Sequence, residues 1–393
     1  NVSTSTHSQD SFEVETYAGK VHIHWDPDSS VTPLGQLAFF IEYLKVGGRF
    51  TPWVDDCPLT YKSNNAPKKT NVLGSLLLSI LSGHRRYAHI STLMNETVNT
   101  EFLGMTKVVS DDSARRALKR IPEDDGIQWL QQHLQSCYEG LLMTPWILDI
   151  DVTVKPLYGH QEGAVVGYNP KKPGRPSHTY HSYLIGKCRL VLDVAVQSGD
   201  QSHSCHAMPG LMSLLARLPP HHQPTFIRGD CDFGNQPVMS ELENNGYQYL
   251  FKLRKSKRVT ALIRDQHGRG NWTRFNDRYE AKEAHLQLFG WPAARRVVIV
   301  RRQIKLAKGA TLGIEHQPPA GQLALAFLSG PEDMSIYEYA VLVTNLSDDL
   351  VALVQHYRDR ADCENCFDEI KNQWGWGGYT THDLKSSQFM SRM

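Results

Sequence analysis

Four polar residues near the end of the chain constrain its interpretation most. Residues 356–371 have the sequence HYRDRADCENCFDEIK, which spaces the following residues three, four and seven positions apart: Tyr357, Arg360, Glu364 and Lys371. On one helix these offsets place all four on the same face. A carboxylate between cations and a phenol suits a metal ion bound to a phosphodiester, because the acid holds the metal and the cations hold the phosphate. The alternative is a solvated helix of mixed charge, which is common.

The size and composition indicate a soluble protein of several domains. With 393 residues, 40% of them hydrophobic, the chain can bury two or three cores, at roughly 100–200 residues per domain. No stretch approaches the roughly 20 apolar residues of a membrane span, and the polar start NVSTSTHSQD lacks the apolar core of a signal peptide. Seven cysteines, an odd number, argue against a disulfide framework. We therefore expect a cytoplasmic protein with no membrane partner.

Positive charge is concentrated in one segment. The formal net charge of the chain is only +1, but residues 252–305 contain 15 Lys and Arg against four Asp and Glu. Such a segment is typical of a surface that faces a polyanion such as nucleic acid. Within it we predict that four arginines contact DNA: Arg295, Arg296, Arg301 and Arg302. The alternative is a highly charged β-rich insertion that faces solvent.

The N-terminal part of the chain is helical, and the rest mixes strands with helices. Apolar periodicity predicts helices over 34–44 and 72–81 and a third that begins near Ser110. The third is short and basic, which fits a DNA recognition helix or an ordinary surface helix. From Trp146 the pattern is that of an open α/β sheet. The expected strands are 146–154, 182–196, 225–230, 247–254, 294–304, 323–328 and 338–344, and the expected helices are 211–218, 237–244 and a long one from about 349.

Two further acids stand where a metal site would need them. Asp151 alternates with Asp149 in the strand LDIDVTV, so both side chains point to one face of an otherwise apolar strand. Asp230 ends the strand TFIRGD, and acids at the carboxyl ends of strands in an open α/β sheet lie at the rim where ligands bind. A buried carboxylate without a partner is costly, which favours a metal ion as its partner. The alternative for each acid alone is a turn or cap residue.

These residues resemble those of the DDE transposases of bacterial insertion sequences, in the branch with a Tyr-x2-Arg-x3-Glu-x6-Lys signature. The signature is matched by the four residues of 356–371 named above, and Asp151 and Asp230 resemble the first and second acids of the family. Asp149 and Asp232 remain rivals for those two positions. The resemblance implies an α/β, RNase H-like mixed sheet flanked by helices. It also implies a β-rich insertion between the second and third acids, and an α-helical N-terminal region precedes the sheet.

The resemblance also implies the chemistry and the partners. Asp151, Asp230 and Glu364 would hold two Mg²⁺ or Mn²⁺ ions, while Tyr357, Arg360 and Lys371 would hold the phosphates of the transposon end. Trp291, or alternatively Trp272, would stack on an extruded base; otherwise it belongs to the core. The expected partners are inverted-repeat ends and target DNA, bound by a homodimer in a synaptic complex. The expected location is the bacterial cytoplasm, in association with the nucleoid.

Four segments are expected along the chain. They are a helical DNA-binding region over 1–140, two parts of the catalytic core over 141–253 and 337–393, and the basic insertion over 254–336. The chain starts at Asn1 and ends at Met393, soon after the signature helix, so we expect the core to be truncated at its C-terminus. Two alternative functions remain: an RNase H-like nuclease without strand transfer, and a domesticated or inactive DNA-binding derivative. A glycosidase would also use paired carboxylates, but it would leave the basic insertion unexplained.

Overall fold

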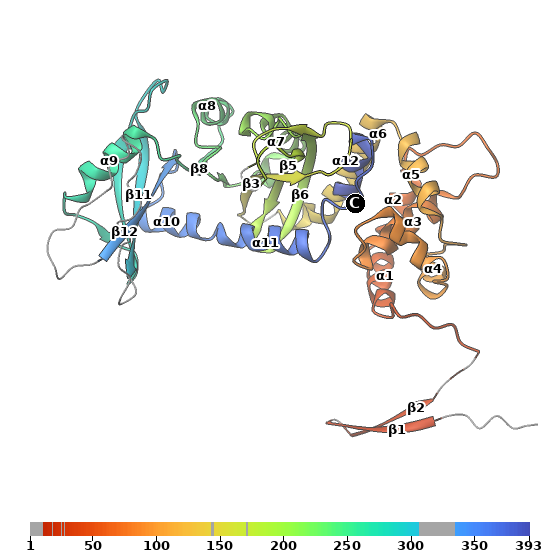
Figure 1. Cartoon of the computed structure of the whole chain (residues 1–393). Helices are drawn as coiled ribbons and strands as arrows, with labels where there is room; N and C mark the ends of the chain where they lie inside the picture. The colour runs from red at the N-terminus through yellow and green to blue at the C-terminus, as the bar shows by residue number, and fades with distance from the viewer. Residues whose placement is uncertain are drawn as a thin grey trace, which may run out of the picture. The chain divides into compact units, whose positions relative to one another are not determined.

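The chain forms two compact units, Asn1–Ile121 and Pro122–Met393 (Figure 1). The computed structural model describes residues 11–17, 19–24, 26, 28–142, 145–169, 172–305 and 335–393. The strand expected at 323–328 lies outside these residues. Among the helices of the described segments, none has the length and apolar character needed to cross a membrane.

The first unit is helical apart from one hairpin. Its elements are β1 Ser11–Thr16, β2 Gly19–His24, α1 Leu37–Val46, α2 Phe50–Asp55, α3 Lys69–Leu81, α4 Val98–Phe102 and α5 Asp111–Arg120. The two apolar helices predicted from periodicity are confirmed as α1 and α3. The hairpin was not predicted, because the sequence before residue 30 is polar.

Helix α5 has the start and the faces that its sequence predicts. Ser110 caps it, since its side chain accepts a hydrogen bond from the backbone N–H of Ser113. Ala114 and Leu118 are fully buried on one face. Lys119 and Arg120 are exposed in its last turn, where cations also complement the helix dipole. The helix therefore has a basic outer face on a packed inner one.

The second unit is built on one mixed sheet. Its first strands are β3 Ile147–Pro156, β4 Val165–Val166, β5 Pro176–Ile185, β6 Leu190–Ser198, β7 Phe226–Gly229 and β8 Tyr249–Lys252. β5 pairs antiparallel with both β3 and β6, whereas β7 runs parallel to both β3 and β8. The order β6-β5-β3-β7-β8, with an antiparallel half and a parallel half, is that of an RNase H-like sheet. The predicted fold class is thus confirmed.

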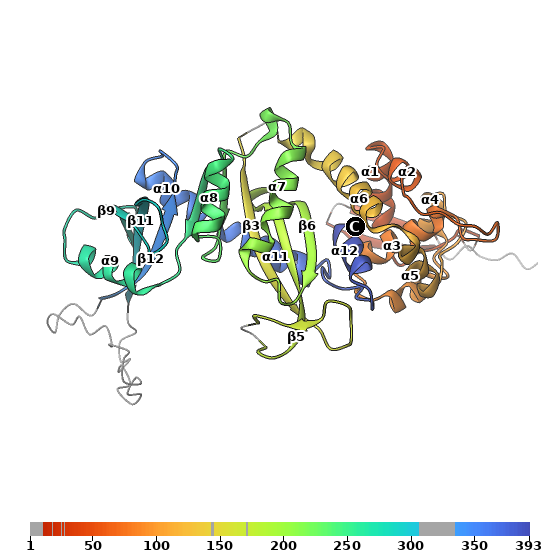
Figure 2. The same ribbon diagram turned by 90° about the horizontal axis from the view of Figure 1, so that it is seen from above.

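Helices cover both faces of this sheet. They are α6 Glu123–Tyr138, α7 Met208–Arg217, α8 Gln236–Asn244, α10 Leu350–Arg358, α11 Ala361–Asn372 and α12 Leu384–Arg392. Figures 1 and 2 show α7 and α11 on opposite sides of β3, β5 and β6. Leu148 and Ile150 pack into the core that includes α7 and α8. On the other face Leu184 packs with Cys363 and Cys366 of α11, so this CxxC pair is part of a core.

The insertion continues the sheet instead of forming a separate one. It contains α9 Lys257–His267, β9 Thr273–Arg274, β10 Tyr279–Leu286 and β11 Arg295–Lys305, and β12 Ser335–Thr344 leads from its end into the segment 337–393. β12 pairs antiparallel with β8 on one side and with β11 on the other. Val297 and Ile299 join the core shared with α9, and Val298 joins the core shared with α10. Burial on both faces explains the unbroken apolar run in β11. Helix α9 was not predicted.

Two elements that were predicted as continuous are each divided into two in the structure. The strand expected at 182–196 is a hairpin that turns at Gly186 and at Arg189, whose φ of 53° is left-handed. The single helix expected from about 349 is two helices. Between them the backbone tightens to three-residue hydrogen bonds, in which the N–H of Arg360 donates to the carbonyl of Tyr357 over 3.2 Å. The signature residues therefore lie on two successive helices.

His181 gives the second unit a defined sensitivity to acid. This side chain is fully buried on β5, and burial lowers its pKa from 6.5 to about 4. Between these pH values the unfolded chain binds a proton that the folded chain does not, so stability falls as pH falls. We expect the unfolding free energy of His181→Gln to fall less steeply with falling pH than that of the parent, with a slope smaller by up to about 1.4 kcal/mol per pH unit. Urea unfolding at pH 7, 5.5 and 4.5 measures this, with the exposed His221→Gln as control. Equal slopes for the parent and His181→Gln would contradict it.

Candidate active site

Asp151 and Asp230 meet on neighbouring parallel strands. β3 and β7 are in register from Ile147 to Ile150, which lies opposite Gly229. Asp151 and Asp230 each follow by one residue, so they stand at the same level on strands that are about 4.8 Å apart. The alternation of the strand turns Asp151 toward the face that α11 covers. The structure thus brings two of the three predicted acids together.

Both carboxyls are held in an environment that disfavours their charge. Burial is the main cause that raises the pKa of Asp151 from 3.8 to about 6, and the neighbouring Asp230 raises it further. The pKa of Asp230 is also raised, chiefly by burial. Arg360 opposes both shifts. Two like charges in a partly desolvated site are stabilised by a cation, which is the condition that a metal site requires.

Arg360 links the strand to the signature helix. Its Nη2 donates to Asp151 Oδ1 over 3.1 Å, and its Nη1 lies 3.5 Å from Glu364 Oε1. Its side chain is 12% exposed, whereas that of Glu364 is 74% exposed. Glu364 therefore lies beside Arg360 and faces solvent. The guanidinium is the cation that contacts Asp151 in this structure.

Tyr357 and Lys371 complete the surroundings of the two aspartates. Burial is the main cause that raises the pKa of Tyr357 to about 12; the charge of Arg360 lowers this pKa, and the charges of Asp230 and Glu364 raise it. Lys371 Nζ donates to Thr153 Oγ1 over 3.2 Å, two residues after Asp151 on β3. All four signature residues therefore lie along the edge of the sheet that carries the acids.

Asp149, the rival for the first acid, already has a partner. Arg228 of β7 donates to both of its oxygens, over 2.6 and 2.8 Å, and both side chains are almost fully buried. The backbone N–H of Gly186 donates to Asp149 Oδ2 over 3.2 Å, and a Cβ at Gly186 would stand only 2.8 Å from that oxygen. Arg228 also donates to the carbonyl of His356 in α10. This pair ties β3, β7 and α10 together.

The role of Arg228 was not predicted from the sequence. The signal was a lone arginine within the apolar strand TFIRGD. Asp232, the rival for the second acid, is similarly engaged, because it forms an ion pair with Arg254. Its backbone N–H donates to Asp230 Oδ1 over 2.9 Å, which orients the Asp230 carboxylate. Both rivals thus have arginine partners of their own, and both neighbour the acids that were predicted.

The four arginines predicted to contact DNA all form ion pairs within the protein. Their partners are Glu243 for Arg295, Glu283 for Arg296, Glu280 for Arg301 and Glu338 for Arg302, at 2.6 to 2.9 Å. Arg302 is about half exposed, and the other three are mostly buried. Glu280 and Glu283 already belong to the count for 252–305, whereas Glu243 and Glu338 lie outside it and lower its excess of 11 positive charges (15 minus four) to nine.

Trp291 lies in the core. It is 6% exposed and belongs to the same cluster as the strands of the catalytic sheet, and Arg295 covers its ring at 4.9 Å. This placement agrees with the alternative left open by the sequence. Base stacking would require Trp291 to leave the core. Trp272 is partly buried, with Arg301 4.0 Å from its ring centre.

The acids suit a hard divalent cation. Carboxylate oxygens are the donors that Mg²⁺ and Mn²⁺ prefer. Within the described part of the chain, no three His, Cys, Asp or Glu side chains are already gathered as a metal-binding group. Asp151 and Asp230 are the pair in place, and the exposed Glu364 side chain is the nearby third donor. These three acids therefore fit a divalent cation. Arg360 contacts Asp151 on one side and Glu364 on the other.

The sequence of the chain matches a known family over most of its length. The profile described as Transposase DDE domain group 1 matches residues 62–391, so the chain belongs to this family. Its function is that of a DDE transposase, a metal-dependent enzyme that cuts and joins DNA. Among curated proteins no sequence matches the chain.

The solved structures that resemble the chain include three at 11% sequence identity. A piggyBac transposase synaptic complex with hairpin DNA has a TM-score of 0.43, and the alignment covers 91% of this chain and 72% of that one. A Mos1 mariner paired end complex with Mn has a TM-score of 0.19, with coverage of 60% and 85%. The Mos1 strand transfer complex has a TM-score of 0.18, with coverage of 61% and 74%. The family assignment rests on the profile alone.

Proposed function

We propose that the chain is the transposase of a bacterial insertion sequence, in the branch with the Tyr-Arg-Glu-Lys signature, and that Asp151, Asp230 and Glu364 are its three acids. The observation that carries the proposal is the bridge made by Arg360, which contacts Asp151 on one side and Glu364 on the other. It connects the first acid to the third across 213 positions of the chain, the separation of residues 151 and 364. The long-range part of this bridge is the contact of Arg360 with Asp151, which holds the start of α11 against β3.

Two Mg²⁺ or Mn²⁺ ions at the acids would activate the attacking oxygen and stabilise the leaving one. Asp151 and Asp230 would hold the ions from the sheet, and Glu364 would supply a further ligand from α11. The exposed side chain of Glu364 can reach them by a change of rotamer. Arg360, released from the acids, then binds a phosphate of the DNA end, as do Tyr357 and Lys371. Lys371 already projects to the Asp151 strand through Thr153.

The rest of the chain supplies DNA binding. We propose that residues 1–140 bind the transposon end, with the basic outer face of α5 as one contact surface. Residues 141–253 and 337–393 form the catalytic core, and the insertion at 254–336 adds backbone contacts, among which Arg302 is the most exposed of the four predicted arginines. A homodimer would hold two ends in a synaptic complex in the bacterial cytoplasm, at the nucleoid.

An assay of cutting and joining tests this function. The substrate is a labelled duplex that carries the inverted repeats bordering the coding sequence, incubated with the protein, a target plasmid, and Mg²⁺ or Mn²⁺. We expect a nick that leaves a 3′-hydroxyl at the repeat, followed by covalent joining to the plasmid. Nicking without joining would instead identify an RNase H-like nuclease. Binding without nicking would identify a DNA-binding derivative.

A further inference from the structure

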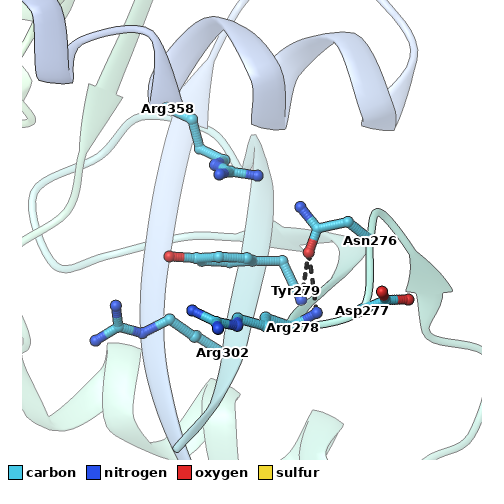
Figure 3. Close-up of a pocket in the computed structure, with 6 residues that line it drawn as sticks. All are labelled: Asn276, Asp277, Arg278, Tyr279, Arg302 and Arg358. Atoms are coloured by element: carbon cyan, nitrogen blue, oxygen red, sulfur yellow. Dashed lines mark hydrogen bonds between the residues drawn. The ribbon is translucent and has the colours of Figure 1, made fainter.

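A pocket of about 360 Å³ opens on the insertion beside the end of α10 (Figure 3). It is lined by the turn before β10, by the first residue of β10, by one residue of β11 and by the last residue of α10: Asn276, Asp277, Arg278, Tyr279, Arg302 and Arg358. Arg358 directly follows Tyr357 of the signature. The pocket is therefore separate from the acids but adjoins the helix that leads to them.

Hydrogen bonds, strand pairing and a cation–π contact fix the positions of the residues that line the pocket. Asn276 Oδ1 accepts hydrogen bonds from the N–H groups of Arg278 and Tyr279, over 2.9 and 3.1 Å, as Figure 3 shows. This local bond is typical of Asn in a tight turn. Arg302 lies directly opposite Tyr279 in the pairing of β10 with β11. The guanidinium of Arg358 lies over the ring of Tyr279 at 4.5 Å, so its position is also constrained.

The charge of the lining is positive. Asp277 is neutralised by Arg274, at 2.7 Å and outside the pocket, and Arg302 is paired with Glu338. Across the segments that the structure describes, Arg278 and Arg358 take part in no ion pair. In Figure 3 these two guanidiniums lie on opposite sides of the Tyr279 ring, and the lining holds three arginines against the single carboxylate of Asp277. This differs from the rest of the insertion strands, where the arginines named above are matched by glutamates.

We propose that this pocket binds one phosphate of a DNA strand that runs from the acids across the insertion. The inference rests on the proposed function and adds a DNA backbone subsite to it. Guanidinium groups match the oxygens of a phosphate in planar, paired geometry, so a phosphate at the edge of the Tyr279 ring can contact Arg358 on one side and Arg278 on the other. Arg358 covers one face of Tyr279, which favours a backbone phosphate over a stacked base. Arg358 and Arg360 then hold the same strand on the two sides of the α10–α11 turn.

The salt dependence of DNA binding tests the subsite. The probe is a fluorescent duplex of mixed sequence, titrated with the full chain by anisotropy over a series of salt concentrations without divalent metal. For Arg278→Ala with Arg358→Ala we expect weaker binding and a slope of log affinity on log salt that is shallower by about 0.9, the value for one lost phosphate contact. Arg278→Lys with Arg358→Lys keeps both charges and should restore the parent slope. The control is Arg269→Ala, an exposed arginine of the insertion that pairs with Asp265 outside the pocket.

The outcomes separate the subsite from the function. If the double alanine variant keeps the salt slope of the parent, the proposed phosphate subsite is wrong. Binding and cleavage of DNA by the parent would still support the transposase function. A parent that binds no DNA at any salt concentration contradicts the function itself. Inorganic phosphate is titrated alone in parallel. Saturable binding of this ion, lost in the double alanine variant with no change in the DNA slope, would overturn the assignment to DNA.

Discussion

Glu364→Gln abolishes most DNA cleavage and leaves DNA binding intact, if Glu364 is the third acid. Glutamine keeps the size of the side chain but removes the charge that a divalent cation needs. The loss of one group that stabilises the transition state costs on the order of 10²–10³-fold in rate, and the loss of a metal ligand is at least comparable. Binding is expected to survive or to tighten, because a negative charge near the DNA is removed. Cleavage of a labelled end and anisotropy of the same duplex measure the two effects.

The matched control for this variant is Glu369→Gln. Glu369 lies on the same helix, α11, but pairs with Arg189 at the surface, where an ion pair is worth at most about 1 kcal/mol. It should cleave like the parent. If Glu364→Gln cleaves as fast as the parent in Mg²⁺ or Mn²⁺, the third acid is misassigned. Asp368, one turn further along α11, then becomes the residue to substitute.

Arg228→Met destabilises the second unit by about 3–5 kcal/mol, the cost of leaving one partner of a buried ion pair alone. The variant leaves the buried Asp149 carboxylate without its ion-pair partner, and it removes the hydrogen bond from Arg228 to the carbonyl of His356. Thermal and urea unfolding measure the loss. Because the cost arises from the lone charge, adding Asp149→Leu to Arg228→Met should recover a large part of it.

The control for this prediction is Arg189→Met, which breaks a surface pair with Glu369 in the same unit. It should cost no more than about 1 kcal/mol. A loss of that small size for Arg228→Met would show that Asp149 is not committed to Arg228. Asp149 would then return as a rival to Asp151 for the first acid.

Local patterns predicted the strands that carry the acids. Asp151 and Asp230 belong to short apolar runs whose alternation and ends are visible in a few residues, and both runs are strands. The tight turn at Arg360 and the hairpin at Gly186 were not visible, because helical offsets and apolar runs continue through them. In both places backbone geometry, not residue type, breaks the element.

The remaining errors come from contacts between distant residues. Arg228 lies 79 positions from Asp149, and Arg295 lies 52 positions from Glu243. A local count of charge does not show which glutamates pair with the arginines of the insertion, and it leaves out Glu243 and Glu338. The pocket at Arg358 arises in the same way, since Asn276 and Arg358 meet only through the folded sheet. Ion-pair partners at such distances have no signal in a single sequence.

The most direct test of the account is the joining of an end that is already cut. A duplex with the inverted repeat and a free 3′-hydroxyl is incubated with a target plasmid and Mn²⁺, and joined product is measured for the parent, Asp151→Asn, Asp230→Asn and Glu364→Gln. If the three acids form one site, the parent joins the end and each variant fails to join it although it binds the duplex. Joining by any one of the three variants at the rate of the parent would contradict the claim that these acids form the catalytic site.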